Sequence, residues 1–137
     1  LFATEEFNID SLGGAGLLSE FGSLGNSSVE LDEIDRVVAL CDETFVSRVY
    51  WQYKNFKDIT SSGGYASLSL YPQAELQMNK LRTLATPYAQ IVAGTPLRMQ
   101  FERQSSAFVF EYVANNASSV QSRTTELHMA AEIQYED

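Results

Sequence analysis

The first part of the chain arranges its apolar and polar residues in the order of a strand followed by a helix. Residues 16–20 form a short apolar run that closes on Glu20, which predicts a buried strand with a carboxylate at its end. The stretch 22–28 is rich in Gly, Asn and Ser and predicts a loop. Ser27 and Glu30 have the spacing of a capping box, so a helix is expected to begin at this point.

The helix predicted after Ser27 leads into a second strand. Acidic residues fill its first turns, where the helix dipole favours negative charge. Its apolar positions step by three and four, at Ile34, Val37, Val38, Cys41 and Phe45. An aromatic run over residues 46–53 then predicts another strand. Strand, helix and strand in this order are typical of a βαβ unit, in which the two strands are parallel.

A long polar stretch and a second helix are predicted next. Residues 55–71 are small and polar, and they predict a loop that leaves the carboxyl end of the second strand, where binding sites often form. A helical spacing resumes from about residue 73. The helix is expected to continue to Gly94, with a kink at Pro87.

The last part of the chain changes to the two-residue period of β-strands. Apolar and polar residues alternate over residues 97–102 and again over 108–112. A third, shorter alternation covers residues 126–129. The pattern predicts antiparallel strands.

Composition and charge narrow the classes of function. With 137 residues, 45% of them apolar, the chain has the size of one ordinary domain and can bury a core. A net charge of -9 opposes binding to nucleic acid. No apolar run approaches the roughly 18 residues of a membrane span. One His and one Cys do not provide the ligands of a zinc site, so no metal or cofactor is expected, and Cys41 is expected to be a buried, inert thiol.

Glu20 and Trp51 are candidate site residues because Glu20 ends the first predicted strand and Trp51 lies near the carboxyl end of the second. The carboxyl ends of parallel barrel strands meet at one mouth, toward which catalytic side chains point. Two hypotheses stay open for Glu20, a catalytic carboxylate and a salt-bridged structural one. Trp51 is either a core residue or a flat platform for a sugar. Gln52 and Lys54 follow with polar groups, although a lysine there is ordinarily solvated, and His128 is expected to have a surface or cross-strand role.

Three blocks of sequence carry a resemblance to a known family. They read SLGGAGLLSEFG at residues 11–22, YWQYK at residues 50–54 and YAQIVAGTP at residues 88–96. In this order and spacing they resemble endoglycoceramidase-like enzymes of glycoside hydrolase family 5. The match covers nearly the whole chain, and the three blocks together are far more specific than a strand-final glutamate alone.

The resemblance implies an α/β fold in two parts. Residues 1–93 are expected to be the C-terminal quarter of a (β/α)₈ TIM barrel, and residues 94–137 the start of an antiparallel β-sandwich domain that is incomplete in this chain. The N-terminal barrel half of the same parent chain is the expected partner. Because a barrel needs eight strands, residues 1–137 alone are expected to be inactive.

For the chemistry, the resemblance implies a retaining glycosidase. Glu20 falls on the catalytic nucleophile and Trp51 on the aromatic residue that lines the sugar subsite, while Gln52 and Lys54 lie in the substrate-binding motif. In this mechanism one carboxyl protonates the departing oxygen while a second attacks the anomeric carbon. The family's acid/base residue comes from an earlier strand, outside this chain.

The function implied is hydrolysis of the bond between oligosaccharide and ceramide in glycosphingolipids. Two alternatives stay open: a family member that acts on glucosylceramide or steryl glucosides, and a non-catalytic carbohydrate- or lipid-binding β module. The triplets that begin at Asn26 and Asn116 fit the pattern of glycosylation acceptors, and they suit a secreted or lumenal protein.

Overall fold

The chain folds into two compact units that are described separately below. The computed structural model describes residues 8–9, 11–53, 69–72, 75–115 and 124–135. The first unit comprises residues Leu1–Leu84 and the second residues Ala85–Asp137. None of the helices in the described ranges is long and apolar enough to cross a membrane.

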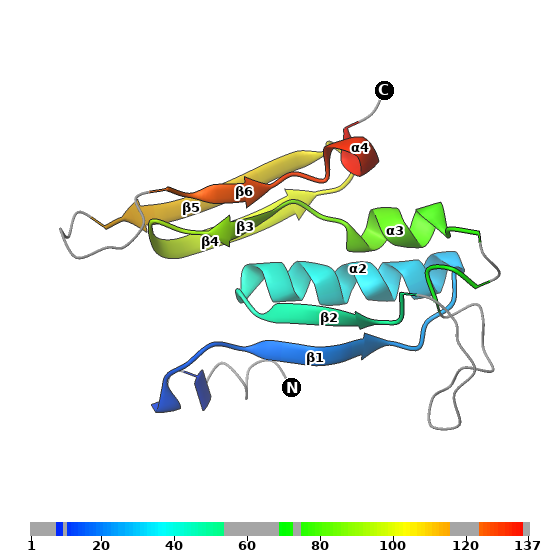
Figure 1. Ribbon diagram of the computed structural model, residues 1–137, viewed down its shortest axis with the longest axis horizontal. Helices are drawn as coiled ribbons and strands as arrows, with labels where there is room; N and C mark the ends of the chain where they lie inside the picture. The colour runs from blue at the N-terminus through cyan, green and yellow to red at the C-terminus, as the bar shows by residue number, and fades with distance from the viewer. Residues whose placement is uncertain (1–7, 10, 54–68, 73–74, 116–123, 136–137) are drawn as a thin grey trace. The chain divides into compact units, whose positions relative to one another are not determined.

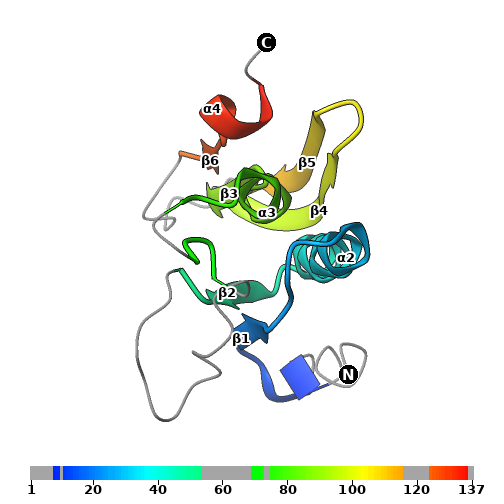
Figure 2. The same cartoon turned by 90° about the vertical axis from the view of Figure 1, so that its right-hand side faces the viewer.

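The first unit contains the predicted βαβ arrangement. Strand β1 (Leu17–Gly22) is followed by helix α2 (Ser28–Glu43) and strand β2 (Ser47–Trp51), and the two strands pair in parallel. Helix α2 runs along one side of the strand pair (Figures 1 and 2). A second helix, α3 (Met78–Leu84), packs against α2. The prediction of strand, helix and parallel strand is therefore confirmed.

Helix α2 begins at the predicted capping box. The Glu30 carboxylate accepts hydrogen bonds from the backbone N–H of Ser27 (3.1 Å), from the Ser27 hydroxyl (2.5 Å) and from the backbone N–H of Gly25 (2.8 Å). These donors, the Ser27 hydroxyl first, lower the pKa of Glu30. The helix buries its predicted apolar stripe at three positions, Ile34, Val38 and Cys41.

Two residues of the apolar stripe predicted for α2, Phe45 and Cys41, can be compared with the structure. Phe45 was expected on the buried face, but the helix ends at Glu43 and Phe45 takes a left-handed backbone conformation with φ of 54°, which leaves its ring 36% exposed. Cys41 is buried as predicted, and burial raises the pKa of its thiol. The prediction was wrong for Phe45 because the 3.6-residue pattern runs past the end of the helix.

The second predicted helix is much shorter than expected. Helix α3 ends at Leu84, and residues Tyr88–Ile91 form strand β3 instead of a continued helix to Gly94. Pro87 explains the difference, since a proline provides no N–H and disfavours a helical conformation in the residue before it. The kink predicted at this proline is in fact the end of the helix. The predicted loop over residues 55–71 lies mostly outside the described residues.

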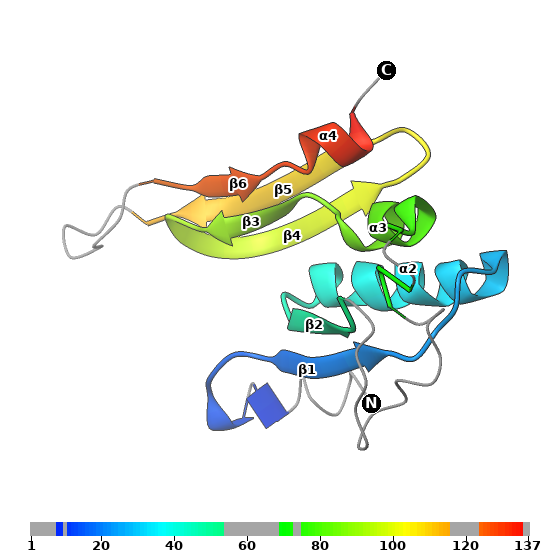
Figure 3. The same ribbon diagram turned by 45° about the vertical axis from the view of Figure 1, so that its right-hand side comes forward.

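The second unit is built from two antiparallel strand pairs and a short helix. Strands β4 (Gly94–Glu102) and β5 (Ala107–Ala114) form a hairpin, and β3 pairs with β6 (Glu126–His128) (Figure 3). Helix α4 covers Ala131–Gln134. The prediction of antiparallel strands in this part of the chain is confirmed by β4, β5 and β6. Tyr88 and His128 stack across the β3–β6 pair with their ring centroids 4.9 Å apart, in the cross-strand role expected of the histidine.

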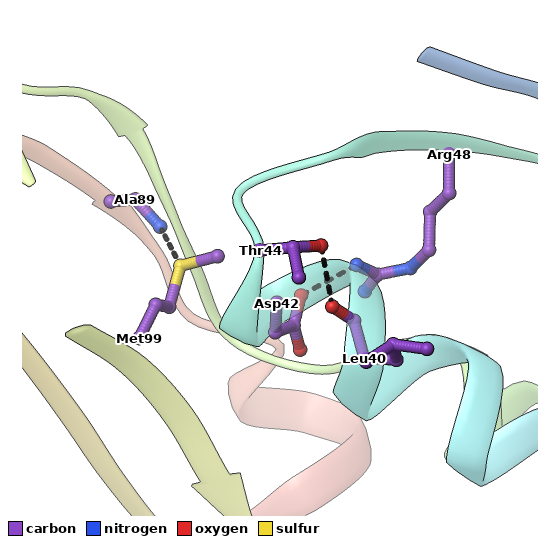
Figure 4. A network of polar contacts seen from close by, with 6 residues as sticks. All are labelled: Leu40, Asp42, Thr44, Arg48, Ala89 and Met99. Atoms are coloured by element: carbon purple, nitrogen blue, oxygen red, sulfur yellow. Dashed lines mark hydrogen bonds and ion pairs between the residues drawn. The ribbon is translucent and has the colours of Figure 1, made fainter. Parts of the chain in front are cut away.

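Hydrogen bonds within the second unit include residues 85–93. The backbone N–H of Ala89 in β3 donates to the Met99 sulfur of β4 at 3.3 Å (Figure 4). The Gln134 side-chain amide donates to the carbonyl oxygen of Ala85 at 2.9 Å. The compact units consequently divide after Leu84, and the expected boundary after residue 93 lies inside the second unit.

Candidate active site

The parallel β1–β2 pair contains a register shift beside Glu20. Leu18 pairs with Arg48 and Phe21 pairs with Tyr50, so two residues of β1, Ser19 and Glu20, lie opposite a single residue of β2. A two-against-one arrangement of this kind is a β-bulge, which re-aims the side chains that follow it.

The bulge determines which face of the sheet Glu20 occupies. Phe21 and Tyr50 are on the same face, since they are paired in the register and their rings meet edge to face at 5.4 Å. Side chains alternate along a strand, so Glu20 is on the opposite face, together with Trp51. In a regular ladder Glu20 would pair with Tyr50 and occupy the other face. The extra residue therefore brings the carboxylate and the indole to one face at the carboxyl ends of the strands.

Helix α2 covers the face of this sheet that carries Phe21 and Tyr50. Arg48, on the Tyr50 face, donates from its guanidinium to the Asp42 carboxylate of α2 at 2.5 Å (Figure 4). Burial on the same face raises the pKa of Tyr50 to about 12. On the Glu20 and Trp51 face, by contrast, Leu17 is 62% exposed and Val49 is 51% exposed. The two candidate residues thus share the face that α2 leaves uncovered, where two apolar side chains are also exposed.

Gly22 allows the ends of the two strands to approach closely. It pairs with Trp51, and a Cβ atom at this position would lie 2.1 Å from the Trp51 carbonyl oxygen. Its φ of 144° also belongs to a region that residues with side chains rarely adopt. The peptide bond between Trp51 and Gln52 is cis. Only glycine fits at position 22 without displacing the backbone beside the indole.

The predicted site residues differ from one another in their exposure and in their hydrogen bonds. The Glu20 side chain is exposed, and among the described residues no hydrogen bond or ion pair involves its carboxylate. Gln52 is 5% exposed, and its side-chain oxygen has no hydrogen-bond partner in the described part of the chain. Its backbone carbonyl accepts a bond from Leu70 N–H at 3.1 Å. Lys54 lies outside the described residues.

Lys80 is a residue near the site that was not predicted from the sequence. It lies on α3, is completely buried, and donates from Nζ to the carbonyl oxygen of Leu24 at 2.9 Å. Burial lowers the pKa of this lysine to about 8, and the nearby Glu30 carboxylate opposes that effect. A lysine in a short amphipathic helix is normally solvated, so the sequence around Lys80 gave no signal that this side chain is buried.

The charged residues near the strand ends do not form a metal site in the structure. Among the described residues, no group of three or more His, Cys, Asp and Glu side chains is placed to hold a metal ion. What the described strand ends bring together is one carboxylate, one indole and an apolar face. A carboxylate beside an aromatic platform is suited to attack on, or stabilisation of, a sugar carbon that develops positive charge.

Comparisons with known proteins find a family model for the last part of the chain and similar folds for most of its length. Residues 87–137 match the model of the glycoside hydrolase family 5 C-terminal domain. No curated protein matches the chain. Three similar solved structures are all endo-glycoceramidase II from Rhodococcus sp., and each is 20% identical in sequence.

The three solved structures differ in what the enzyme holds. The cellobiose-like imidazole complex gives a TM-score of 0.69 and covers 96% of this chain and 27% of that one. The lactosyl-enzyme intermediate gives a TM-score of 0.68 and covers 95% of this chain and 27% of that one. The cellobiose-like isofagomine complex gives a TM-score of 0.70 and covers 96% of this chain and 26% of that one. The chain thus spans about a quarter of the length of the structures that it resembles.

The comparisons confirm the resemblance drawn from the three sequence blocks. The chain carries a match to the glycoside hydrolase family 5 C-terminal domain, and over nearly its whole length its fold is that of part of endo-glycoceramidase II. At 20% identity the likeness to the solved structures is one of fold.

Proposed function

We propose that this chain is part of a retaining endo-β-glycosidase that separates the oligosaccharide from the ceramide of glycosphingolipids. Glu20 is the nucleophile, and Trp51 lines the subsite for the sugar whose bond is cleaved. Gln52 and Lys54 contribute hydrogen bonds and charge to the same substrate. The protein is secreted or lumenal, and its acid/base residue lies in a part of the protein outside this chain.

The observation that carries the proposal is the shared face of Glu20 and Trp51. Both residues belong to the carboxyl ends of parallel strands, on the side away from α2. Catalytic side chains of a (β/α)₈ barrel come from this end of its strands. The exposed apolar side chains of Leu17 and Val49 on the same face suit the packed interior of a barrel.

We accordingly assign the two parts of the chain to two domains. The segment with β1, α2, β2 and α3 is the last quarter of a (β/α)₈ barrel, and the β4–β5 hairpin with β3 and β6 belongs to a C-terminal β-sandwich. The earlier strands of the barrel, from the same parent chain, cover the apolar face of β1 and β2. They also supply the second carboxyl group.

In the proposed mechanism Glu20 attacks the anomeric carbon. The acid/base carboxyl, about 5 to 5.5 Å away in retaining enzymes, protonates the oxygen that leaves with the ceramide. A covalent glycosyl-enzyme forms on Glu20, and water then releases the sugar while the second carboxyl acts as base. The Trp51 indole offers a flat apolar surface to the C–H face of the sugar ring.

The test replaces Glu20 by Gln in the full-length protein that contains this chain. A fluorescent glycosphingolipid is the substrate, and Glu33→Gln, on the exposed side of α2, is the matched control. The amide has nearly the same shape but is a poor nucleophile, so we expect kcat to fall by about 10³-fold or more in E20Q. E33Q should retain the activity of the unaltered protein.

Two further measurements sharpen the result. A 2-fluoro glycoside inactivator should label the peptide that contains Glu20, as detected by mass spectrometry. The released oligosaccharide should keep the β configuration when it is followed by NMR. Full activity of E20Q, or a label on another carboxyl, would remove Glu20 from this role. Turnover of glucosylceramide or steryl glucosides alone would change the substrate, and tight glycolipid binding without turnover would favour the binding module.

A further inference from the structure

The end of β1 and the loop that follows it are held at three positions shortly after the candidate nucleophile. Gly22, the last residue of β1, is pressed against the Trp51 carbonyl, and in the loop Leu24 accepts a hydrogen bond from Lys80 and the N–H of Gly25 donates to Glu30. Each contact fixes a backbone atom rather than the end of a flexible side chain. The loop begins at Ser23, three residues after Glu20, so its position sets the direction in which β1 ends.

We propose that Lys80 is a positioning residue for Glu20, acting through its hydrogen bond to the Leu24 carbonyl oxygen. The proposal rests on the proposed function, because it assigns Lys80 a part in placing that nucleophile. Lys80 does not touch the substrate, since its side chain is completely buried. It acts from α3, 56 residues further along the chain than the loop it holds.

The cost of burying this side chain points to a specific task. A lysine is among the residues least often fully buried, because its ammonium group loses its hydration. An apolar residue at position 80 would fill the same space against α2 without that cost. What an apolar residue could not do is donate to the Leu24 carbonyl, which would then lose this partner inside the protein.

Glu30 completes the arrangement from the opposite side. Its carboxylate accepts hydrogen bonds from Gly25 and Ser27, and its negative charge lies close enough to Lys80 to affect the pKa of the lysine. A Cβ atom at Gly25 would lie 2.7 Å from a Glu30 carboxylate oxygen, so the loop backbone lies directly against the charge. Lys80 and Glu30, here called the loop clamp, therefore hold the two sides of one peptide group, through the carbonyl oxygen of Leu24 and the N–H of Gly25.

A small displacement of the nucleophile is costly for catalysis. A shift of about 1 Å in a reacting group can reduce the rate by about 10²-fold. Loosening the clamp lets the residues after Glu20 move, while the indole of Trp51 stays on β2. The expected signature is a loss in the chemical step with little change in substrate binding.

The test measures kcat and KM of Lys80→Met in the full-length protein with the fluorescent glycosphingolipid. Methionine keeps an unbranched apolar stem and removes the donor. We expect kcat to fall by about tenfold or more while KM changes by less than about threefold. Lys80→Arg keeps an N–H donor and should recover part of the lost kcat.

Val38→Ala is the control for a loss of stability alone. Val38 is buried on α2 and takes no part in the hydrogen bonds of the loop. At equal loss of thermal stability, V38A should keep its kcat within about twofold of the unaltered protein. The inference is overturned if K80M keeps an unaltered kcat, if V38A loses as much as K80M, or if K80R is no better than K80M.

Failure of this inference can be distinguished from failure of the proposed function. If the unaltered protein turns over the glycolipid and E20Q does not, the function stands whatever K80M does. If E20Q is fully active, the nucleophile has been misassigned and the role of Lys80 falls with it. An unaltered kcat in K80M together with an inactive E20Q removes Lys80 alone.

Discussion

The β1–β2 pair and the β4–β5 hairpin are both simple two-stranded ladders, but they differ in where they are irregular. The hairpin runs in unbroken register from the pairing of Arg98 with Glu111 to that of Glu102 with Ala107. The parallel pair changes register in its middle, beside Glu20, and then ends in Gly22 with a φ of 144° and Ser23 with a φ of 58°. Departures from regular geometry often mark functional sites, because the surrounding structure has to maintain them.

The difference shows in the polar contacts as well. In the first unit a buried lysine and a carboxylate hold backbone atoms of a loop. In the hairpin, Met99 is buried and the phenylalanines that share its face are half-buried. The ion pair of the hairpin, between Arg98 and Glu111, is exposed and loose, at 3.9 Å. Exposed pairs of this kind add little to stability. The irregular pair is thus stabilised by specific polar contacts, and the hairpin by its apolar face.

The largest effect is expected at Gly22, the position that allows the two parallel strands to meet. Gly22→Ala should lower the free energy of unfolding by about 2–4 kcal/mol, through an unfavourable φ and a clash with the Trp51 carbonyl oxygen. The measurement is urea unfolding of the full-length protein, with kcat measured in parallel.

Gly14→Ala is the matched control for this substitution. Gly14 has a positive φ of 117° as well, but a Cβ there would meet no atom within 4 Å. G14A should therefore show the backbone strain without the clash, and the difference between the variants reports the contact with Trp51. Equal losses in both variants would mean that the strand ends are not pressed together.

The next largest effect is expected in the part of the β4–β5 hairpin that keeps a regular register, at Met99. Met99 is buried and its sulfur accepts the Ala89 N–H, so Met99→Ala should cost about 2–3 kcal/mol of stability. In the same strand Leu97 is 60% exposed, and Leu97→Ala should cost less than about 0.5 kcal/mol. Thermal unfolding distinguishes the two. Both variants should keep the kcat of the unaltered protein, and a loss of kcat in M99A at moderate temperature would contradict the contrast between the two ladders.

The same pair of residues illustrates what could be predicted from the sequence and what could not. The alternation over residues 97–102 placed Leu97, Met99 and Phe101 on one face. Met99 and Phe101 follow it, but the register shifts between Pro96 and Arg98, and Leu97 is exposed. A two-residue period predicts faces well within a regular ladder, and it carries no signal for a bulge.

In the candidate site, too, some features could be predicted from the sequence and others could not. The two strands that carry Glu20 and Trp51, and the capped helix between them, were predicted from local patterns. The bulge that brings the two side chains to one face was not, because it depends on pairing with a strand elsewhere in the chain. Lys80 was missed for a related reason, since its partner Leu24 is 56 residues away and only the packing of α3 on α2 joins them.

The effect most gradual in its onset concerns the buried amine of Lys80, and pH should reveal it. Folding lowers the pKa of this lysine from 10.5 to about 8, so between these values the unfolded chain binds more protons than the folded one. Stability contributed by this group therefore rises with pH across that window, by about 1.4 kcal/mol per pH unit at most. Below pH 8 the amine is charged in both states, and the full cost of burying the charge is present.

Lys80→Met provides the reference for this measurement, because the Cys41 thiol and other groups titrate in the same range. The free energy of unfolding of K80M is subtracted from that of the unaltered protein at each pH from 7 to about 10.5. The difference should be constant below about pH 8 and then rise in favour of the lysine. A flat difference would mean that Lys80 keeps an ordinary pKa when folded, either because water reaches its ammonium group or because the Glu30 carboxylate fully offsets the loss of hydration. In either case the cost of burying an uncompensated amine would no longer distinguish the first unit from the hairpin.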